Sequence, residues 1–251
     1  MTIKEIRSIS EITFNFKEKW EAGKDNKKIL VAFDIDNTLV YESEIKKTCD
    51  IIERKMINLI RRLNASPRYE TMGFTARRAH TWYKKQDDVN DWELLDEDEL
   101  NWDDDKKEQV PCEKITCPVE KSTLLTRESL EKKGIFFSCN LPVNFIESDC
   151  RLTRLAEPKF RPTYFEHILF TDFTYNKGEV LYGFLPAIIH EIDTFIMIDD
   201  NDEMLTSIVS AIEDLNKIHN TQVTVEAYWY RRVELREKEK ERRNRRRLHK
   251  S

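Results

Sequence analysis

Long apolar segments are missing from this chain of 251 residues, and no run is long enough to cross a bilayer. The N-terminal residues also lack the apolar core that a signal peptide requires. We therefore expect a protein that is cytoplasmic as synthesised and has no membrane span. Its five cysteines are scattered and odd in number, which is typical of free thiols in a reducing compartment. This expectation leaves open export into a host cell by a route that needs no cleaved signal.

A large excess of one charge is missing as well. The formal net charge is −5, and the asymmetry is local, because residues 87–108 are acidic whereas residues 231–250 carry both signs and end basic. Nucleic acid is therefore not an expected partner. Cys112 and Cys117 would make half of a zinc site, but no second Cys/His pair follows at a suitable spacing, so ordinary loop thiols are favoured.

Glycine is scarce for an α/β protein, with five residues, yet apolar strands and amphipathic helices alternate along the chain as in that class. The pattern predicts strands over residues 29–33, 69–74, 135–137, 166–171, 194–198 and 221–228, and helices over residues 3–20, 42–63, 122–133, 176–184 and 203–218. The first strand, helix and strand predict a right-handed unit with parallel strands. Residues 139–165 are expected to form an irregular hairpin region.

We predict one domain over residues 1–230, with its core at 27–78 and 121–228, followed by a charged tail at 231–251. Residues 79–120 form an acidic insertion between the two parts of the core, and its tryptophans Trp82, Trp92 and Trp102 provide apolar surface to bury. We interpret the tail as a solvated charged helix.

Four groups of polar residues stand where predicted strands end or a helix starts. They are Asp34 with Asp36, Thr75, Lys177, and Asp199 with Asp200. The carboxyl ends of parallel strands converge on one crevice, so these groups are expected to meet there. Burying adjacent carboxylates requires a compensating cation, for which Mg²⁺ and a lysine are the expected candidates.

This set of side chains suits phosphoryl transfer, which needs an in-line nucleophile and neutralisation of the phosphoryl oxygens. Asp34 is the candidate nucleophile and would form an aspartyl-phosphate. Asp36 would protonate the leaving group and then deprotonate water. Thr75 would donate a hydrogen bond to the phosphoryl oxygens, and Lys177, at a helix N-terminus, would neutralise their charge.

Further contacts to the substrate and the metal are expected from neighbouring residues. Arg77 and Arg78 would add contacts to the phosphate. Mg²⁺ binds few carboxylates together with water and substrate oxygens, which Asp34 and Asp199 fit, with Asp200 as a further ligand or just outside the coordination sphere.

The four motifs, in this order, resemble those of the haloacid dehalogenase-like (HAD) phosphatase superfamily. They read DIDNT at 34–38, GFTAR at 73–77, NKG at 176–178 and IDD at 198–200. The resemblance extends from residue 27 to about residue 230 and implies a three-layer Rossmann-like core with a parallel central sheet. It implies the same residue roles and adds Asp36 as a metal ligand through its backbone carbonyl. The dehalogenase branch is disfavoured, because Asp36 has no use where no leaving oxygen needs a proton.

Substrate selectivity in this superfamily usually comes from cap insertions. Residues 41–68 are predicted to hold one helix only, which is a minimal first cap, whereas the 79–120 insertion follows Thr75 and should lie near the crevice. Its aromatic residues would stack on an aryl phosphate or a protein side chain, and its acids would repel polyanions. A phosphoprotein, in particular one carrying phosphotyrosine, is the expected substrate. The pattern is similar to HAD phosphatases of intracellular bacterial pathogens, some of which act on phosphotyrosine and are delivered into host cells.

Several alternatives stay open at this point. Thr171 also ends an apolar strand, but Thr75 is favoured as the second-motif residue because it closes the first strand–helix–strand unit. The two acids at 34 and 36 would also suit a helix N-cap or the metal site of a sugar transferase, which Lys177 and Asp199 disfavour. A function of another class is a binding protein that recruits a basic partner through the insertion and has a vestigial phosphatase site. The oligomeric state does not follow from the sequence.

Overall fold

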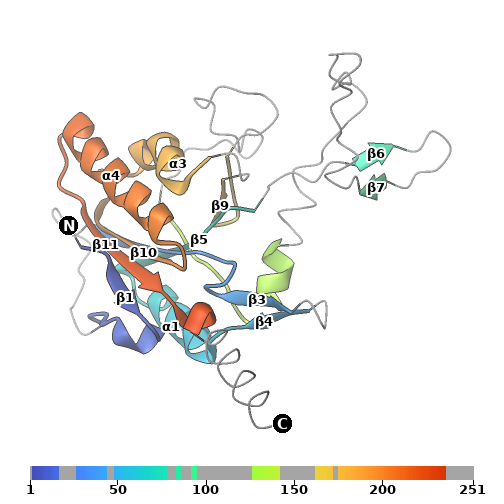
Figure 1. The fold of residues 1–251 in the computed structure, drawn as a ribbon. Coiled ribbons are helices and arrows are strands. Elements are labelled where there is room, and N and C mark those ends of the chain that lie inside the picture. The colour runs from blue at the N-terminus through green and yellow to red at the C-terminus, as the bar shows by residue number, and fades with distance from the viewer. Residues whose placement is uncertain are drawn as a thin grey trace, which may run out of the picture.

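The computed structural model of the chain describes residues 2–16, 27–43, 48–77, 83–85, 92–94, 126–141, 162–171 and 175–235. Its centre is a seven-stranded sheet with the order β1-β11-β10-β2-β5-β9-β8 (Figure 1). The strands are β1 (Lys4–Ile6), β2 (Lys28–Phe33), β5 (Tyr69–Thr75), β8 (Thr163–Phe165), β9 (Ile168–Phe170), β10 (Ile192–Asp199) and β11 (Thr224–Tyr230). All neighbours pair in parallel except β8 with β9, so this is an α/β fold with a mostly parallel sheet, as predicted.

Helices cover both faces of the sheet. On one face, α3 (Lys177–Phe184) and α4 (Asp202–His219) lie side by side (Figure 1). On the other face, α1 (Arg54–Asn64) and the helical residues 126–131 contribute to a second apolar cluster. Leu30 and Ala32 of β2 belong to the first cluster, and Val31 and Phe33 belong to the second. A strand buried on both faces explains the unbroken apolar run in the sequence.

Most of the predicted elements are confirmed. The second predicted strand is β5, and the strand predicted over 166–171 is β9, which starts after a turn at Glu166 and His167, both with positive φ. The helices starting at Lys177 and Asp202 and the strands β10 and β11 agree with the sequence to within a few residues. Gly134 ends the 126–131 helix with a φ of 80°, as a glycine there allows.

The prediction of a helix over residues 3–20 is wrong for the described part. Residues 4–6 form β1, and a single 3-10 turn, η1 (Ile9–Glu11), follows with Ser8 as its cap. The isoleucines recur every three residues, as in a helix, but β1 satisfies its backbone by pairing with β11 while Ile6 and Ile9 are buried in the second cluster. Pairing with an open sheet edge therefore outweighs the helical period.

The helix predicted over 42–63 starts too early. An antiparallel hairpin of β3 (Val40–Ser43) and β4 (Thr48–Ile51) occupies its first part, and α1 begins only at Arg54. The segment 41–68 therefore holds a hairpin as well as a helix. The strand predicted at 135–137 is also wrong: Ser138 makes one isolated bridge to Thr71, because β9 occupies the position beside the end of β5.

Only a short hairpin of the predicted insertion, β6 (Tyr83–Lys85) with β7 (Trp92–Leu94), belongs to the described residues. The aspartates of this segment, with Trp82 and Trp102, lie outside them, as does the tail beyond Leu235. Within the described residues, every helix is too short or too polar to span a membrane.

Candidate active site

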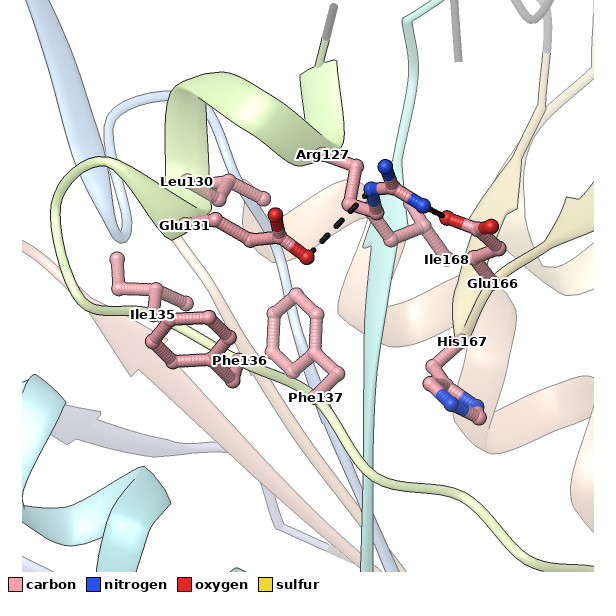
Figure 2. Close-up of a pocket in the computed structure, with 9 residues that line it drawn as sticks. All are labelled: Arg127, Leu130, Glu131, Ile135, Phe136, Phe137, Glu166, His167 and Ile168. Atoms are coloured by element: carbon pink, nitrogen blue, oxygen red, sulfur yellow. Dashed lines mark hydrogen bonds and ion pairs between the residues drawn. The ribbon is translucent and has the colours of Figure 1, made fainter. Parts of the chain in front are cut away.

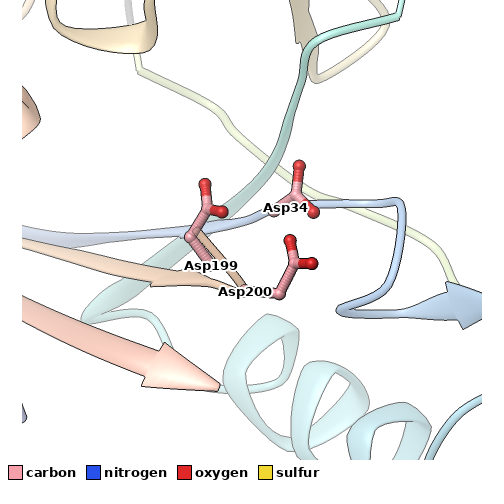
Figure 3. Close-up of side chains that lie close together, drawn as sticks. All are labelled: Asp34, Asp199 and Asp200. Atoms are coloured by element: carbon pink, nitrogen blue, oxygen red, sulfur yellow. The ribbon is translucent and has the colours of Figure 1, made fainter. Parts of the chain in front are cut away.

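Two adjacent strands place Asp34 and Asp199 side by side. Phe33 of β2 pairs with Ile198 of β10, and the Asp34 N–H donates to the Ile198 carbonyl at 2.9 Å. Side chains alternate between the faces of a strand, so Asp34 follows Leu30 and Ala32 toward the face that α3 and α4 cover. Asp199 projects to the same face, and the two carboxylates lie next to each other (Figure 3).

Lys177 reaches both carboxylates from the first turn of α3. Asn176 caps this helix by accepting from the Glu179 N–H, which fixes where the helix starts. The Lys177 Nζ lies 2.7 Å from Asp34 Oδ1 and 2.5 Å from Asp199 Oδ2. The three residues are 2%, 5% and 1% exposed, respectively. These are therefore charge-assisted bonds that water does not screen.

The charges in this cluster do not balance. Asp200 lies with Asp34 and Asp199, and the three residues offer ligand oxygens within 4.8 Å of one another (Figure 3). Burial raises the pKa of Asp34 well above its ordinary value, with Lys177 opposing and the two other aspartates adding to the rise. Burial, together with Asp199, raises the pKa of Asp200 to about 6. Burial works against the charge of Lys177, but Asp199 and Asp34 outweigh it and raise its pKa.

The donor set therefore fits a hard divalent cation. Three carboxylates against one ammonium leave an excess of negative charge. All ligand atoms are oxygens, the donor atoms that hard cations such as Mg²⁺ prefer. The loop that carries Asp200 is held by two further bonds: the Asn201 N–H donates to Asp199 Oδ1 at 2.9 Å, and the Trp229 indole N–H donates to the Asp200 carbonyl at 3.0 Å.

Asp36 stands apart from these three acids. Its carboxylate accepts from Arg77 Nε at 2.8 Å and from Arg77 Nη2 at 2.6 Å, and the Thr75 hydroxyl lies 3.5 Å away. The Arg77 N–H donates in turn to the Thr75 hydroxyl at 3.2 Å. Thr75 ends β5, the neighbour of β2, so these residues share the carboxyl edge of the sheet with Asp34.

Thr171, the alternative to Thr75 as the second-motif residue, lies one strand farther from Asp34. Thr171 follows β9, and its N–H donates to the Thr75 carbonyl at 2.9 Å. Its buried hydroxyl makes no hydrogen bond among the described residues. Of the two threonines, Thr75 is the one that contacts Asp36. Arg78 lies outside the described residues, so its predicted phosphate contact has no structural counterpart.

Sequence reasoning missed three contacts of this site. Asn201 caps α4 by accepting from the backbone N–H groups of Glu203 and Met204. An asparagine directly before two acids at a helix start is a sequence signal for such a cap. The bidentate bond between Arg77 and Asp36 and the bond from Trp229 to the Asp200 loop depend on tertiary packing, and no spacing in the sequence indicates them.

A hollow of about 330 Å³ lies elsewhere, between residues 126–131, Phe137 and the turn before β9 (Figure 2). Arg127 pairs there with Glu131 and Glu166. None of the described candidate site residues lines it.

A model of the family described as "Protein of unknown function (DUF2608)" matches residues 114–241, just over half of the 251 residues. The chain belongs to this family. No curated protein and no solved structure matches it. The DUF2608 segment contains Lys177, Asp199 and Asp200, whereas Asp34 and Asp36 precede it. The candidate site thus combines the family segment with the part of the chain before it.

Proposed function

We propose that this member of the DUF2608 family is a Mg²⁺-dependent phosphomonoester hydrolase with a HAD-like core. The observation that supports the proposal most strongly is the buried Lys177 ammonium between Asp34 and Asp199, beside the third carboxylate of Asp200. A lysine and one aspartate would suffice for packing, whereas surplus carboxylates at the carboxyl edge of a parallel sheet are typical of a ligand site.

Asp34 is the nucleophile in this proposal. One of its oxygens, Oδ1, is held by Lys177, which orients the other toward a phosphorus atom outside the sheet edge. Formation of the Asp34–phosphorus bond breaks the ester bond, and the leaving oxygen takes a proton from Asp36. A water molecule then gives a proton to Asp36, attacks phosphorus and releases Asp34 and inorganic phosphate.

The remaining residues stabilise charge in this reaction. Asp34, Asp199 and Asp200 would hold Mg²⁺, with the Asp36 carbonyl as a further ligand, and the bound cation would neutralise phosphoryl oxygens. Lys177 supplies a fixed positive charge, and the Thr75 hydroxyl supplies a hydrogen bond.

The proposed substrate is a phosphoprotein that carries phosphotyrosine, or another aryl phosphate. The support is compositional: the segment that leaves the sheet after Thr75 is rich in tryptophan and in acids, which suit an aromatic side chain and disfavour polyanions and nucleic acid. Phosphotyrosine, phosphoserine and sugar phosphates offered in parallel test this class, and a preference for the sugar phosphates would contradict it.

Substitution of the nucleophile tests the reaction. We expect the Asp34→Asn variant to lose at least about 10³-fold in kcat on nitrophenyl phosphate, because the amide oxygen cannot form the intermediate. Chelation of Mg²⁺ should have a comparable effect on the wild-type protein. Asp193→Asn is the matched control: Asp193 is on β10 as well, at the opposite end from Asp199, and should leave kcat unchanged. Turnover by Asp34→Asn at the wild-type rate would refute the assignment.

A further inference from the structure

The ion pair between Arg77 and Asp36 conflicts with the roles expected of both residues. The sequence predicts that Arg77 contacts the phosphate and that Asp36 exchanges a proton with the leaving group and water. In the structure each oxygen of Asp36 accepts an N–H of Arg77, at 2.8 and 2.6 Å. A carboxyl group that contacts a leaving oxygen needs one of its oxygens free for that contact.

The pair is accessible to a competing anion. The side chains of Arg77 and Asp36 are 26% and 47% exposed, in contrast to the buried pairs of Lys177, whose partners are almost fully covered. A guanidinium binds a phosphate in the same bidentate manner as a carboxylate, and a phosphoryl dianion offers more charge and three oxygens. The backbone of Arg77 is anchored to the Thr75 hydroxyl, so the side chain can change partner while the loop stays in place.

We propose that Arg77 is a positioning residue that holds Asp36 between turnovers and releases it when a phosphoryl group arrives. The phosphoryl oxygens replace the carboxylate on the guanidinium, and the freed Asp36 takes a proton from solvent and faces the leaving group as the acid. After product phosphate departs, Asp36 gives the proton that it took from water to solvent, and the pair forms again. This inference rests on the proposed phosphatase function, and it adds that substrate binding itself makes the acid available.

Binding of inorganic phosphate tests the exchange of partners without turnover. Calorimetry with Mg²⁺ present would compare wild type, Arg77→Ala, Asp36→Asn and the double variant. In the wild type, the gain of the Arg77–phosphate contact is offset by the loss of the Arg77–Asp36 contact. We therefore expect Arg77→Ala to weaken phosphate binding about 3- to 10-fold more in the presence of Asp36→Asn than alone, the range of a partly exposed ion pair. Equal losses in both backgrounds would overturn the proposal.

Turnover gives a second readout, because the proposed release of Asp36 from Arg77 predicts that Arg77→Ala affects KM and kcat differently. In Arg77→Ala, KM should rise at least about fivefold, while kcat on a poor leaving group such as phenyl phosphate stays within about twofold. Arg77→Lys should restore part of the affinity through its charge. If kcat of Arg77→Ala falls as far as that of Asp36→Asn, Arg77 is needed beside Asp36 during the reaction, and release is wrong.

Controls separate the outcomes. Arg127→Ala removes a guanidinium that also pairs with two carboxylates, outside the site, and should change neither KM nor phosphate affinity. Thermal melting of each variant checks that it is folded. If the substitutions at Arg77 and Asp36 show no coupling in phosphate binding, but hydrolysis is intact and depends on Asp34, only the proposed release of Asp36 is overturned. If the coupling is found but no substrate is hydrolysed, the proposed phosphatase function is overturned, and the exchange of Asp36 for phosphate on Arg77 is retained.

Discussion

Among the described residues, the Lys177 ammonium is the cation that contacts both Asp34 and Asp199, and it is almost fully buried. The Lys177 ammonium and the Mg²⁺ proposed above would both compensate the negative charge of the same carboxylates. Removing one partner of a buried ion pair is costly because the other partner keeps its charge without compensation.

We therefore expect Lys177→Met to lower the free energy of unfolding by about 3 kcal/mol in EDTA at pH 7. Millimolar Mg²⁺ should raise the melting temperature of the variant more than that of the wild type, because the cation becomes the main counter-charge. Melting curves with Mg²⁺ and with EDTA measure both effects. Lys132→Met, at an exposed lysine paired with Glu128, should change stability by less than about 0.5 kcal/mol. A variant as stable as the wild type in EDTA would contradict this charge balance.

At the scale of elements, the position of Lys177 depends on how closely α3 packs against α4. Gly178 makes this approach possible: a Cβ at this position would lie 2.3 Å from the Ser207 carbonyl oxygen. The Gly178 N–H also donates to the Ser207 hydroxyl at 3.1 Å. Gly178, next to Lys177, therefore sets the distance between α3 and α4.

Gly178→Ala should force α3 away from α4, with a loss of about 1–3 kcal/mol in stability and at least a tenfold lower kcat, since Lys177 moves with the helix. Chemical denaturation and nitrophenyl phosphate turnover measure the two effects. Gly134→Ala is a matched change with a strained φ of 80° outside the site. It should cost about 1 kcal/mol and leave kcat unchanged. An equal loss of kcat in both variants would show that the effect is on overall stability.

The elements also show how far the sequence predicts this molecule. Local patterns predict the strands β2, β5 and β10 and the helix α3 that begins near Asn176, because those signals lie within each segment. Parallel strand ends then brought Asp34, Lys177 and Asp199 together, as expected from topology alone. The strand β1, the β3–β4 hairpin and the partner of Arg77 depend on pairing between distant segments, which one-dimensional periodicity does not encode.

At the scale of the whole molecule, one carboxylate ties three distant segments together. Glu53, just before α1, accepts from the Ser8 hydroxyl at 2.7 Å, the Ile9 N–H at 3.1 Å and the Tyr230 hydroxyl at 3.1 Å. Burial would raise the pKa of Glu53, but the bonds from Ser8, Ile9 and Tyr230 outweigh it and lower the pKa. The N-terminal strand is thereby fixed to α1 and to β11.

Glu53→Gln should lower stability at pH 7 by about 1–2 kcal/mol, because the amide accepts fewer of these bonds. An acid with a lowered folded pKa contributes stability above its unfolded pKa of 4.5 and loses it as the pH falls through the folded pKa. The difference between wild type and variant should therefore shrink below about pH 4. Urea denaturation at pH 7 and at pH 3.5 measures it, with Glu128→Gln, at an exposed acid of the 126–131 helix, as control. A difference that grows at low pH would rule out this role.

The strand order has a consequence for how the DUF2608 segment is inherited. Residues 114–241 provide β8 and β9 at one end of the sheet and β10 and β11 toward the other, and β2 and β5 from the preceding part lie between them. Cut out on its own, the segment would leave two pairs of strands with a two-strand gap and no shared ladder. A recombination event that moved only this segment would thus carry neither a continuous sheet nor Asp34. The boundary of sequence similarity is therefore not a boundary of structure.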